Sequence, residues 1–159
     1  MLVGFGYDIH RLQAGLPMRL GGVDIPTAES GPVAHSDGDV VLHALCDALL
    51  GALALGDIGR HFPDTDPAYR GINSLALLRH VVAMVAAHGH RPRNVDCMLI
   101  LERPKIAPYR EPMRHAIADA LGLPVERVSV KATTNEGLGP IGAGEGAAAY
   151  CVVTVEEIA

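Results

Sequence analysis

The sequence HSDGDVVLHALCDALLGALALGDIG, residues 35–59, joins a polar turn, a long apolar run and a glycine-rich stop. The apolar run predicts a helix from Asp39 to Leu55, since it is too long for a typical strand. Asp37 and Asp39 both stand where a side chain can cap the start of that helix. The sequence GDIG, residues 56–59, is expected to end it.

Five strands and two more helices are expected in the rest of the chain. Short runs bounded by turn residues predict strands, and longer apolar runs ended by glycine predict helices. The expected strands are residues 1–8, 18–25 (interrupted by Gly21-Gly22), 95–101, 127–133 and 147–155, and the further helices are residues 74–88 and 111–121. Strands and helices mix without strict alternation, so we predict an α+β fold rather than a doubly wound sheet. Without a linker or internal repeat, residues 1–159 are expected to form a single domain.

Composition and charge argue against several classes of function. The 159 residues are 49% hydrophobic and 19% charged, with 13 basic and 18 acidic residues and a net charge of −5. Because no basic run occurs, nucleic acid and anionic membranes are poor candidate partners. No apolar run approaches the roughly 20 residues that a membrane-spanning helix needs. The first residues, MLVGFGYDIH, carry polar side chains too early for a signal peptide.

The three cysteines, Cys46, Cys97 and Cys151, are odd in number and form no CxxC pair. Disulfide bonds and a structural zinc knuckle are therefore not expected. A reducing cytoplasm is the simplest compartment for such a chain. Cys46 lies within the apolar helix, so we predict that it belongs to the core and is not a nucleophile.

Asp8 and His10 stand two residues apart at the end of the first expected strand. Residues at that spacing project from the same face of a strand, so both can point at one small object. A carboxylate beside an imidazole suits a divalent metal such as Zn²⁺. The alternative is a histidine that only hydrogen-bonds a surface aspartate, and the pair by itself favours this simpler interpretation.

A polar stripe runs along the expected apolar helix. Asp39, His43 and Asp47 follow one another at intervals of four residues, which places them on one helix face. Burying three unpaired polar groups is costly, so the stripe needs an explanation. Asp8, His10 and His43 together would make a three-ligand metal site with an open fourth position, the pattern of a catalytic site. Alternatively, Asp39 is a cap, His43 a hydrogen-bonded core histidine and Asp47 a solvated carboxylate.

Two loops carry further polar groups. Asp57, Asp64 and Asp66 lie in a segment rich in glycine and proline, where they suit a metal-bound or hydroxyl-rich substrate. Alone, these aspartates are better explained as caps of turns and helices. Residues 131–136 and 142–146 offer hydroxyls and backbone N–H groups that can cradle phosphates, or they form only a β-turn and a flexible glycine loop. Neither a Walker pattern nor a dinucleotide-binding glycine fingerprint is present.

Taken together, these motifs resemble those of the 2-C-methyl-D-erythritol 2,4-cyclodiphosphate synthase family. The resemblance covers essentially the whole chain, with the motifs in the family's order. They are GxGxDxH (residues 4–10), HSDGD with a following histidine (35–43), DALLGALALGDIG (47–59), FPDTDP (62–67), RPKI (103–106), KATTNEGLG (131–139) and GEG (144–146). The combination of HSDGDVxxHAL with GDIGxxFPDTDP is very specific.

The resemblance implies a fold, an assembly and a reaction. The family's fold is α+β and ferredoxin-like, with a mixed sheet packed against helices, and its chains form a homotrimer with active sites between subunits. The substrate is 4-diphosphocytidyl-2-C-methyl-D-erythritol 2-phosphate, whose 2-phosphate attacks the β-phosphorus of the diphosphate and releases CMP. The pathway is non-mevalonate isoprenoid synthesis. Phosphoryl transfer depends on positioning and charge neutralisation, so a chain without a Ser-His-Asp triad fits this chemistry.

The resemblance also implies site residues. Asp8, His10 and His43 match the positions that hold Zn²⁺, and a second cation, Mg²⁺ or Mn²⁺, is implied between the substrate phosphates. His35 and Thr134 match positions credited with stabilising the transition state. The two nucleotide-side segments are expected to meet across a subunit boundary. The expected substrate contacts are, near the metal, Asp8, Ile9, His10, His35 and Ser36; on the methylerythritol side, Asp57, Ile58, Gly59, Phe62, Pro63, Asp64, Thr65 and Asp66; and on the nucleotide side, Leu101, Glu102, Arg103, Pro104, Lys105, Ile106, Ala107, Thr133, Thr134, Asn135 and Glu136.

Two positions depart from the family's pattern, and two other functions fit the same residues. Pro140 and Ala143 stand where the family often has an aromatic residue and an arginine, so a phosphate contact associated with that arginine is absent. One alternative is a metal-dependent phosphohydrolase that uses water as the nucleophile on a related diphosphate. The other is a non-catalytic trimeric binding protein with a structural metal. Product analysis distinguishes the first, and an open metal position argues against the second.

Overall fold

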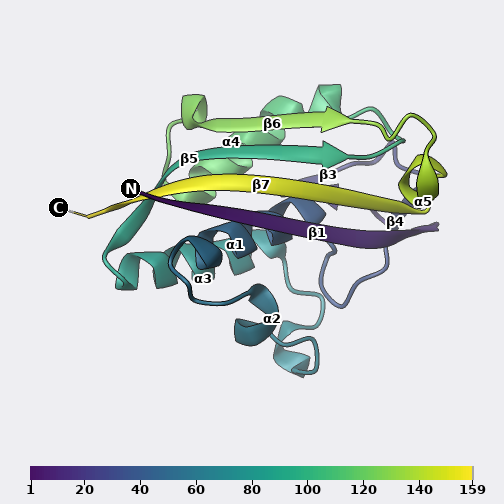
Figure 1. The fold of residues 1–159 in the computed structure, drawn as a ribbon. Coiled ribbons are helices and arrows are strands. Elements are labelled where there is room, and N and C mark those ends of the chain that lie inside the picture. The colour runs from purple at the N-terminus through teal and green to yellow at the C-terminus, as the bar shows by residue number, and fades with distance from the viewer. Residues whose placement is uncertain (159) are drawn as a thin grey trace.

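The structure is a computed structural model that describes residues 1–158, and a five-stranded mixed sheet forms its frame (Figure 1). The strands lie in the order β4-β1-β7-β5-β6, with β5 and β6 parallel and the other neighbouring pairs antiparallel. Mixed pairing of this kind confirms the α+β class predicted from the unsystematic order of strands and helices. The strands are β1 (Leu2–Ala14), β4 (Ser30–Pro32), β5 (His90–Ile100), β6 (Val128–Thr133) and β7 (Gly146–Glu157).

Helix α1 (Val40–Ala52) lies against the middle of this sheet and begins where the sequence predicts. The Asp39 side chain caps it by accepting a hydrogen bond from the backbone N–H of Leu42 at 3.1 Å. Most residues of α1 are buried, as expected for a helix that is apolar on most of its surface. Its predicted end at Leu55 is wrong, because the chain turns at Ala54, whose φ of 55° is left-handed and ends the helical hydrogen bonding.

Helices α3 (Ser74–Ala87) and α4 (Arg110–Leu121) cover the same face of the sheet as α1 (Figure 1). Both agree with the sequence within one residue at each end, and Gly122 ends α4 with a φ of 66°. Two short helices were not predicted, α2 (Ile58–His61) and α5 (Gly139–Gly142). No helix within residues 1–158 is both long and apolar enough to cross a membrane.

The strands differ from prediction near the N-terminus and at β5, which begins at His90 rather than Val95. Strand β1 was expected to end at Asp8 but continues to Ala14, because its backbone pairs first with β7 and then with β4. Residues 18–25, predicted as one strand, form a hairpin of β2 (Arg19–Leu20) and β3 (Val23–Asp24). Gly21 and Gly22 make its turn with φ values of 56° and 80°, which explains why two glycines stand there.

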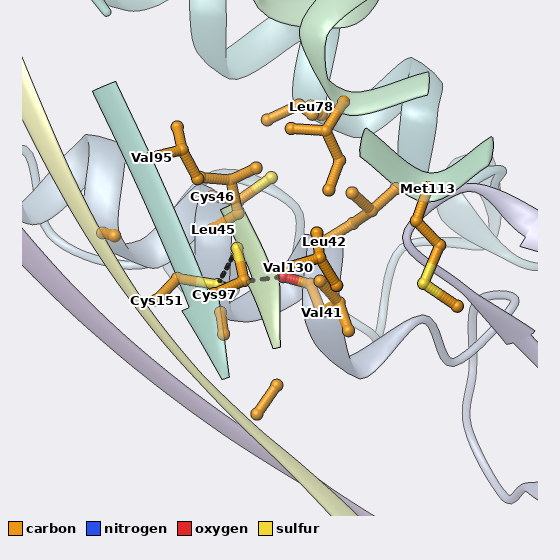
Figure 2. Packing of buried hydrophobic residues seen from close by; sticks show 14 of the residues in the cluster. Val41, Leu42, Leu45, Cys46, Leu78, Val95, Cys97, Met113, Val130 and Cys151 are labelled. Carbon is orange, nitrogen blue, oxygen red and sulfur yellow. Dashed lines mark hydrogen bonds between the residues drawn. The ribbon is translucent and has the colours of Figure 1, made fainter. Parts of the chain in front are cut away.

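The core lies between the sheet and the helices, and Figure 2 shows part of it. Buried side chains of α1, α3, α4 and the inner sheet face belong to one cluster there. All three cysteines are free and buried, and the burial of Cys46 confirms that it belongs to the core. The Cys151 thiol points toward Cys97 on the neighbouring strand and toward the carbonyl oxygen of Val41 (Figure 2). The labelled core residues are Val41, Leu42, Leu45, Cys46, Leu78, Val95, Cys97, Met113, Val130 and Cys151.

Candidate functional site

Strand β1 lies directly against the backbone of helix α1. A Cβ added at Gly6 would stand 1.9 Å from the carbonyl oxygen of Ala44, and one added at Gly4 would stand 1.8 Å from that of Ala48. Only glycine permits so close an approach. Side chains alternate between the faces of a strand, so the next residues on the helix-facing side of β1 also point toward α1.

Those next residues, Asp8 and His10, meet His43 of α1. Asp8 Oδ2 lies 3.0 Å from His43 Nδ1 and 3.0 Å from His10 Nε2. The two imidazoles are in contact as well, with His10 Nε2 3.1 Å from His43 Nδ1. The structure thus brings together the three residues that the sequence analysis named as metal ligands. One ligand atom from each lies within 4.8 Å of the others.

The electrostatics of this triad are those of a carboxylate between two imidazoles. Burial raises the pKa of Asp8, but hydrogen bonds and charge from His10 and His43 outweigh it and lower the pKa to about 2. Burial lowers the pKa of His43, but the hydrogen bond and charge of Asp8 raise it overall. The carboxylate oxygen and the two ring nitrogens that converge here are therefore held together by hydrogen bonds. A divalent metal bound among them would take the place of the protons in those hydrogen bonds.

The donor set fits Zn²⁺. Two imidazole nitrogens and a carboxylate oxygen are ligands that zinc prefers, and three protein ligands leave a fourth position open. The triad lines a cavity of about 360 Å³, so a fourth ligand can reach it. Besides the triad, seven residues that the sequence analysis named for substrate binding line the same cavity, namely His35, Ser36, Ile58, Gly59, Phe62, Pro63 and Asp64.

The remaining predicted residues of this loop have other contacts. Asp57 caps α2 by accepting from the backbone N–H of Arg60 at 2.9 Å. Asp66 accepts from the backbone N–H of Ala68 at 2.9 Å and so caps a turn of 3₁₀ helix. Both contacts agree with the alternative that these aspartates are caps. Thr65 lines a neighbouring shallow cavity together with His35.

The three residues of the polar stripe, Asp39, His43 and Asp47, have different partners. Asp39 is fully buried and accepts from the backbone N–H groups of Gly21 at 2.9 Å and Gly22 at 2.7 Å, in addition to its cap. Burial raises its pKa to about 6 despite those hydrogen bonds. Asp47 accepts from the backbone N–H of Ile58 at 2.8 Å, and burial raises its pKa too. Only His43 of the stripe joins the metal triad, while the two aspartates fasten neighbouring loops to α1.

Eight of the eleven residues predicted for the nucleotide side line a second cavity of about 270 Å³ at the ends of β5 and β6, whereas Arg103 lines a neighbouring one. Glu102 Oε1 accepts from the backbone N–H of Asn135 at 2.5 Å and so ties the two segments together. Thr134 lines this second cavity, whereas His35 lines the metal cavity. Within one chain, therefore, the two residues credited with transition-state stabilisation stand in different cavities. The predicted residues that line the second cavity are Leu101, Glu102, Pro104, Lys105, Ile106, Ala107, Thr133 and Thr134.

Sequence reasoning missed Ser74, the first residue of α3. Its side chain is fully buried, and its Oγ lies 3.0 Å from Nε2 of His43. A serine at the start of an expected helix suggests only a helix terminus, and no spacing connects it with a histidine 31 positions earlier in the chain. This contact becomes visible only when α3 packs beside α1.

The chain is similar to a known protein family over nearly its whole length. The model of the YgbB family matches residues 1–156. A 2-C-methyl-D-erythritol 2,4-cyclodiphosphate synthase of Chloroherpeton thalassium is 57% identical over 99% of this chain and 100% of its own length. The enzyme of that name from Symbiobacterium thermophilum is 58% identical over 98% of each chain.

A solved structure gives the same answer in three dimensions. It is a 2C-methyl-D-erythritol-2,4-cyclodiphosphate synthase in its CDP-bound form, and it superposes with a TM-score of 0.90 at 42% identity over 97% of this chain and 99% of its own. Sequence, fold and the convergence of Asp8, His10 and His43 agree with one another. The chain therefore belongs to the YgbB family, together with the 2-C-methyl-D-erythritol 2,4-cyclodiphosphate synthases.

Proposed function

We propose that the chain is a metal-dependent phosphorus–oxygen lyase that converts 4-diphosphocytidyl-2-C-methyl-D-erythritol 2-phosphate to 2-C-methyl-D-erythritol 2,4-cyclodiphosphate and CMP. The observation that carries the proposal is the open Asp8–His10–His43 triad, in a chain 57% identical to a synthase of that name. An oxygen of the 2-phosphate forms a bond to the β-phosphorus. The bond between that phosphorus and the bridging oxygen breaks, and CMP leaves with the bridging oxygen.

The residues of the metal cavity would orient the reacting phosphates. Asp8, His10 and His43 would hold Zn²⁺, and a second cation, Mg²⁺ or Mn²⁺, would sit between the phosphates. When bound, such cations supply positive charge that stabilises the transition state at phosphate oxygens. The attacking phosphate is already anionic, so no strong general base is needed. His35, on the rim of the cavity, would contribute a hydrogen bond to the transferring group.

The two cavities would bind the two halves of the substrate. The loop from Asp57 to Asp66 would contact the methylerythritol part, since most of its predicted residues line the metal cavity. Residues 101–107 and 133–136 would bind the cytidine diphosphate part, with Thr134 as a donor to the transferring phosphate. A CDP complex of a relative with a TM-score of 0.90 supports a nucleotide site in this fold.

We propose further that three chains assemble with their open sheet faces together. The face of β1 and β7 that points away from the helices carries large exposed apolar side chains, among them Phe5 at 61%, Tyr7 at 43% and Tyr150 at 39% exposure. The Tyr7 and Tyr150 rings lie 4.9 Å apart between centroids. An apolar patch of this kind marks an interaction surface. Assembly would also let His35 of one chain and Thr134 of another complete one site.

Phe5→Asp is expected to dissociate the assembly into folded monomers, because burying an unpaired carboxylate at the interface costs several kcal/mol. Sedimentation velocity would measure the mass, and circular dichroism the fold. Ala83→Asp, on the exposed side of α3, is the matched control and should leave the mass unchanged. A wild-type chain that sediments as a monomer, or a Phe5→Asp variant that stays trimeric, would contradict this assembly.

Phosphorus NMR with the cytidyl diphosphate substrate tests the reaction itself. In the presence of Mg²⁺ and Zn²⁺ we expect signals of a cyclic diphosphate and of CMP in equal amounts. A chelator should abolish both, and added metal should restore them. A linear phosphate in place of the cyclic product would instead identify a phosphohydrolase with water as nucleophile. Turnover that persists in chelator would refute the metal dependence.

A further inference from the structure

The second ring nitrogen of His43 points away from the metal triad and into a buried hydrogen-bond chain. Nε2 lies 3.0 Å from Oγ of Ser74, whose side chain is fully buried. Ser74 Oγ donates in turn to Oδ1 of Asp37, and the backbone N–H of Ser74 donates to Oδ2 of the same carboxylate at 2.8 Å. The structure therefore links His43 to a carboxylate through one hydroxyl.

The direction of the protons in this chain follows from what each group can do. A cation bound among Asp8, His10 and His43 needs the lone pair of His43 Nδ1, so the proton of that ring must sit on Nε2. Nε2–H then needs an acceptor. Ser74 Oγ can accept it only if its own proton points elsewhere, and the Asp37 carboxylate, which has no proton to donate, takes that proton.

We propose that Ser74 and Asp37 are positioning residues that hold His43 in the tautomer whose Nδ1 is free to bind a cation. The inference rests on the metal site of the proposed function and deepens it. Asp37 suits this role because its carboxylate also accepts from the backbone N–H of Asp39 at 3.2 Å, so every contact made to it comes from a donor. Ligating histidines commonly donate their other N–H to such a partner, which fixes the ring and strengthens the ligand.

A second hydroxyl, Ser36 Oγ, lies 3.2 Å from Nε2 of His43 but differs from Ser74 in its surroundings. Apart from His43, its hydrogen-bond partner within residues 1–158 is the backbone N–H of Gly38 at 3.2 Å, which is a donor. No carboxylate among those residues takes the Ser36 proton, so this hydroxyl can either give or receive toward Nε2. Ser74 is therefore the hydroxyl that selects the tautomer.

The substitutions Ser74→Ala and Asp37→Asn separate positioning from simple support of the fold. Ser74→Ala removes the hydroxyl but keeps the backbone N–H that ties the start of α3 to Asp37. Asp37→Asn keeps the size of the side chain but places an amide NH₂ where donors now point. If that NH₂ faces Ser74 Oγ, the hydroxyl proton turns toward Nε2 and favours the tautomer that cannot bind metal. Ser74→Thr restores a hydroxyl at the same position.

The readout is the dissociation constant for Zn²⁺, measured on the full chain by competition with a chromophoric chelator, and the visible spectrum of the Co²⁺-loaded protein. Ser74→Ala and Asp37→Asn are expected to weaken zinc binding about 10- to 100-fold, and Ser36→Ala by a smaller factor. Ser74→Thr should recover most of the affinity. Melting of the metal-free proteins should differ little, since the fold does not need the tautomer.

Zinc affinities of Ser74→Ala and Asp37→Asn within twofold of wild type would overturn the inference. So would a loss of affinity matched by a fall in the melting temperature of the metal-free protein that Ser74→Thr does not rescue. If the wild type itself fails to bind zinc, the metal site of the proposed function is wrong. If zinc affinity responds as expected but no cyclic product forms, the reaction is wrong and the positioning roles stand.

Discussion

Replacing His43 with alanine is expected to abolish zinc binding and to lower turnover by at least about a thousandfold. A metal that stabilises charge at a phosphate contributes several kcal/mol to the barrier, and each 1.36 kcal/mol is about a factor of ten. His43 is the only member of the triad that comes from α1, since Asp8 and His10 both come from β1. Two remaining ligands on one strand cannot enclose the cation.

The fold of His43→Ala should persist. Alanine favours helix more than histidine does, and the ring that is lost borders a cavity of about 360 Å³, which water can enter. Zinc content after dialysis and the phosphorus NMR assay measure the two expected losses, and circular dichroism measures the fold. His115→Ala, on the exposed side of α4, is the matched control and should keep both zinc and turnover. One zinc per chain with wild-type turnover in His43→Ala would refute the metal assignment.

The grouping of Asp8, His10 and His43 could be predicted from the sequence because it follows simple periodicities. The spacing of Asp8 and His10 places both on one face of a strand, and the stripe through Asp39, His43 and Asp47 marks one face of a helix. What periodicity cannot supply is the partner of each group. Asp39 and Asp47 lie on the same helix face as His43, yet they hold backbone N–H groups of neighbouring loops. Those partners depend on how the loops pack.

Element boundaries failed where backbone pairing overrode side-chain character. Asp8, His10 and Arg11 look like the polar end of a strand, but their backbone groups pair with β7, so β1 continues through them. Helix α1 ends early for a different reason, because Ala54 takes a left-handed conformation that is unusual for alanine, and the backbone N–H of Leu55 then bonds to the carbonyl oxygen of Leu50. At β1 the sequence signal is local, whereas the deciding backbone pairing with β7 is distant in the chain.

Gly6→Ala is expected to destabilise the chain by at least about 3 kcal/mol or to prevent folding. The new methyl would stand 1.9 Å from the carbonyl oxygen of Ala44, a backbone atom that cannot turn aside as a side chain can. Strand β1 is held by β7 through most of its length, and most residues of α1 are buried, so neither can retreat. The urea midpoint of the metal-free protein measures the loss.

Gly51→Ala is the matched control, because Gly51 lies in α1 and the nearest atom to an added Cβ is the carbonyl oxygen of Phe5 at 3.9 Å. That variant should be neutral or up to about 1 kcal/mol more stable, since alanine restricts the unfolded chain and favours helix. A urea midpoint for Gly6→Ala equal to that of wild type would show that strand and helix can separate without cost, against the close packing inferred here.

Gly6→Ala should also weaken zinc binding in whatever fraction of the protein folds. Gly6, Asp8 and His10 share the helix-facing side of β1. A methyl group that pushes the strand away from α1 would therefore also move Asp8 and His10 away from His43. The 3.0 Å separation of Asp8 Oδ2 and His43 Nδ1 would widen with it. His43→Ala, by contrast, removes the metal and leaves the packing. If Gly6→Ala lowers stability but not zinc affinity, the glycines serve the fold alone; a joint loss means that the same glycine spacing sets both the packing of β1 on α1 and the geometry of the metal site.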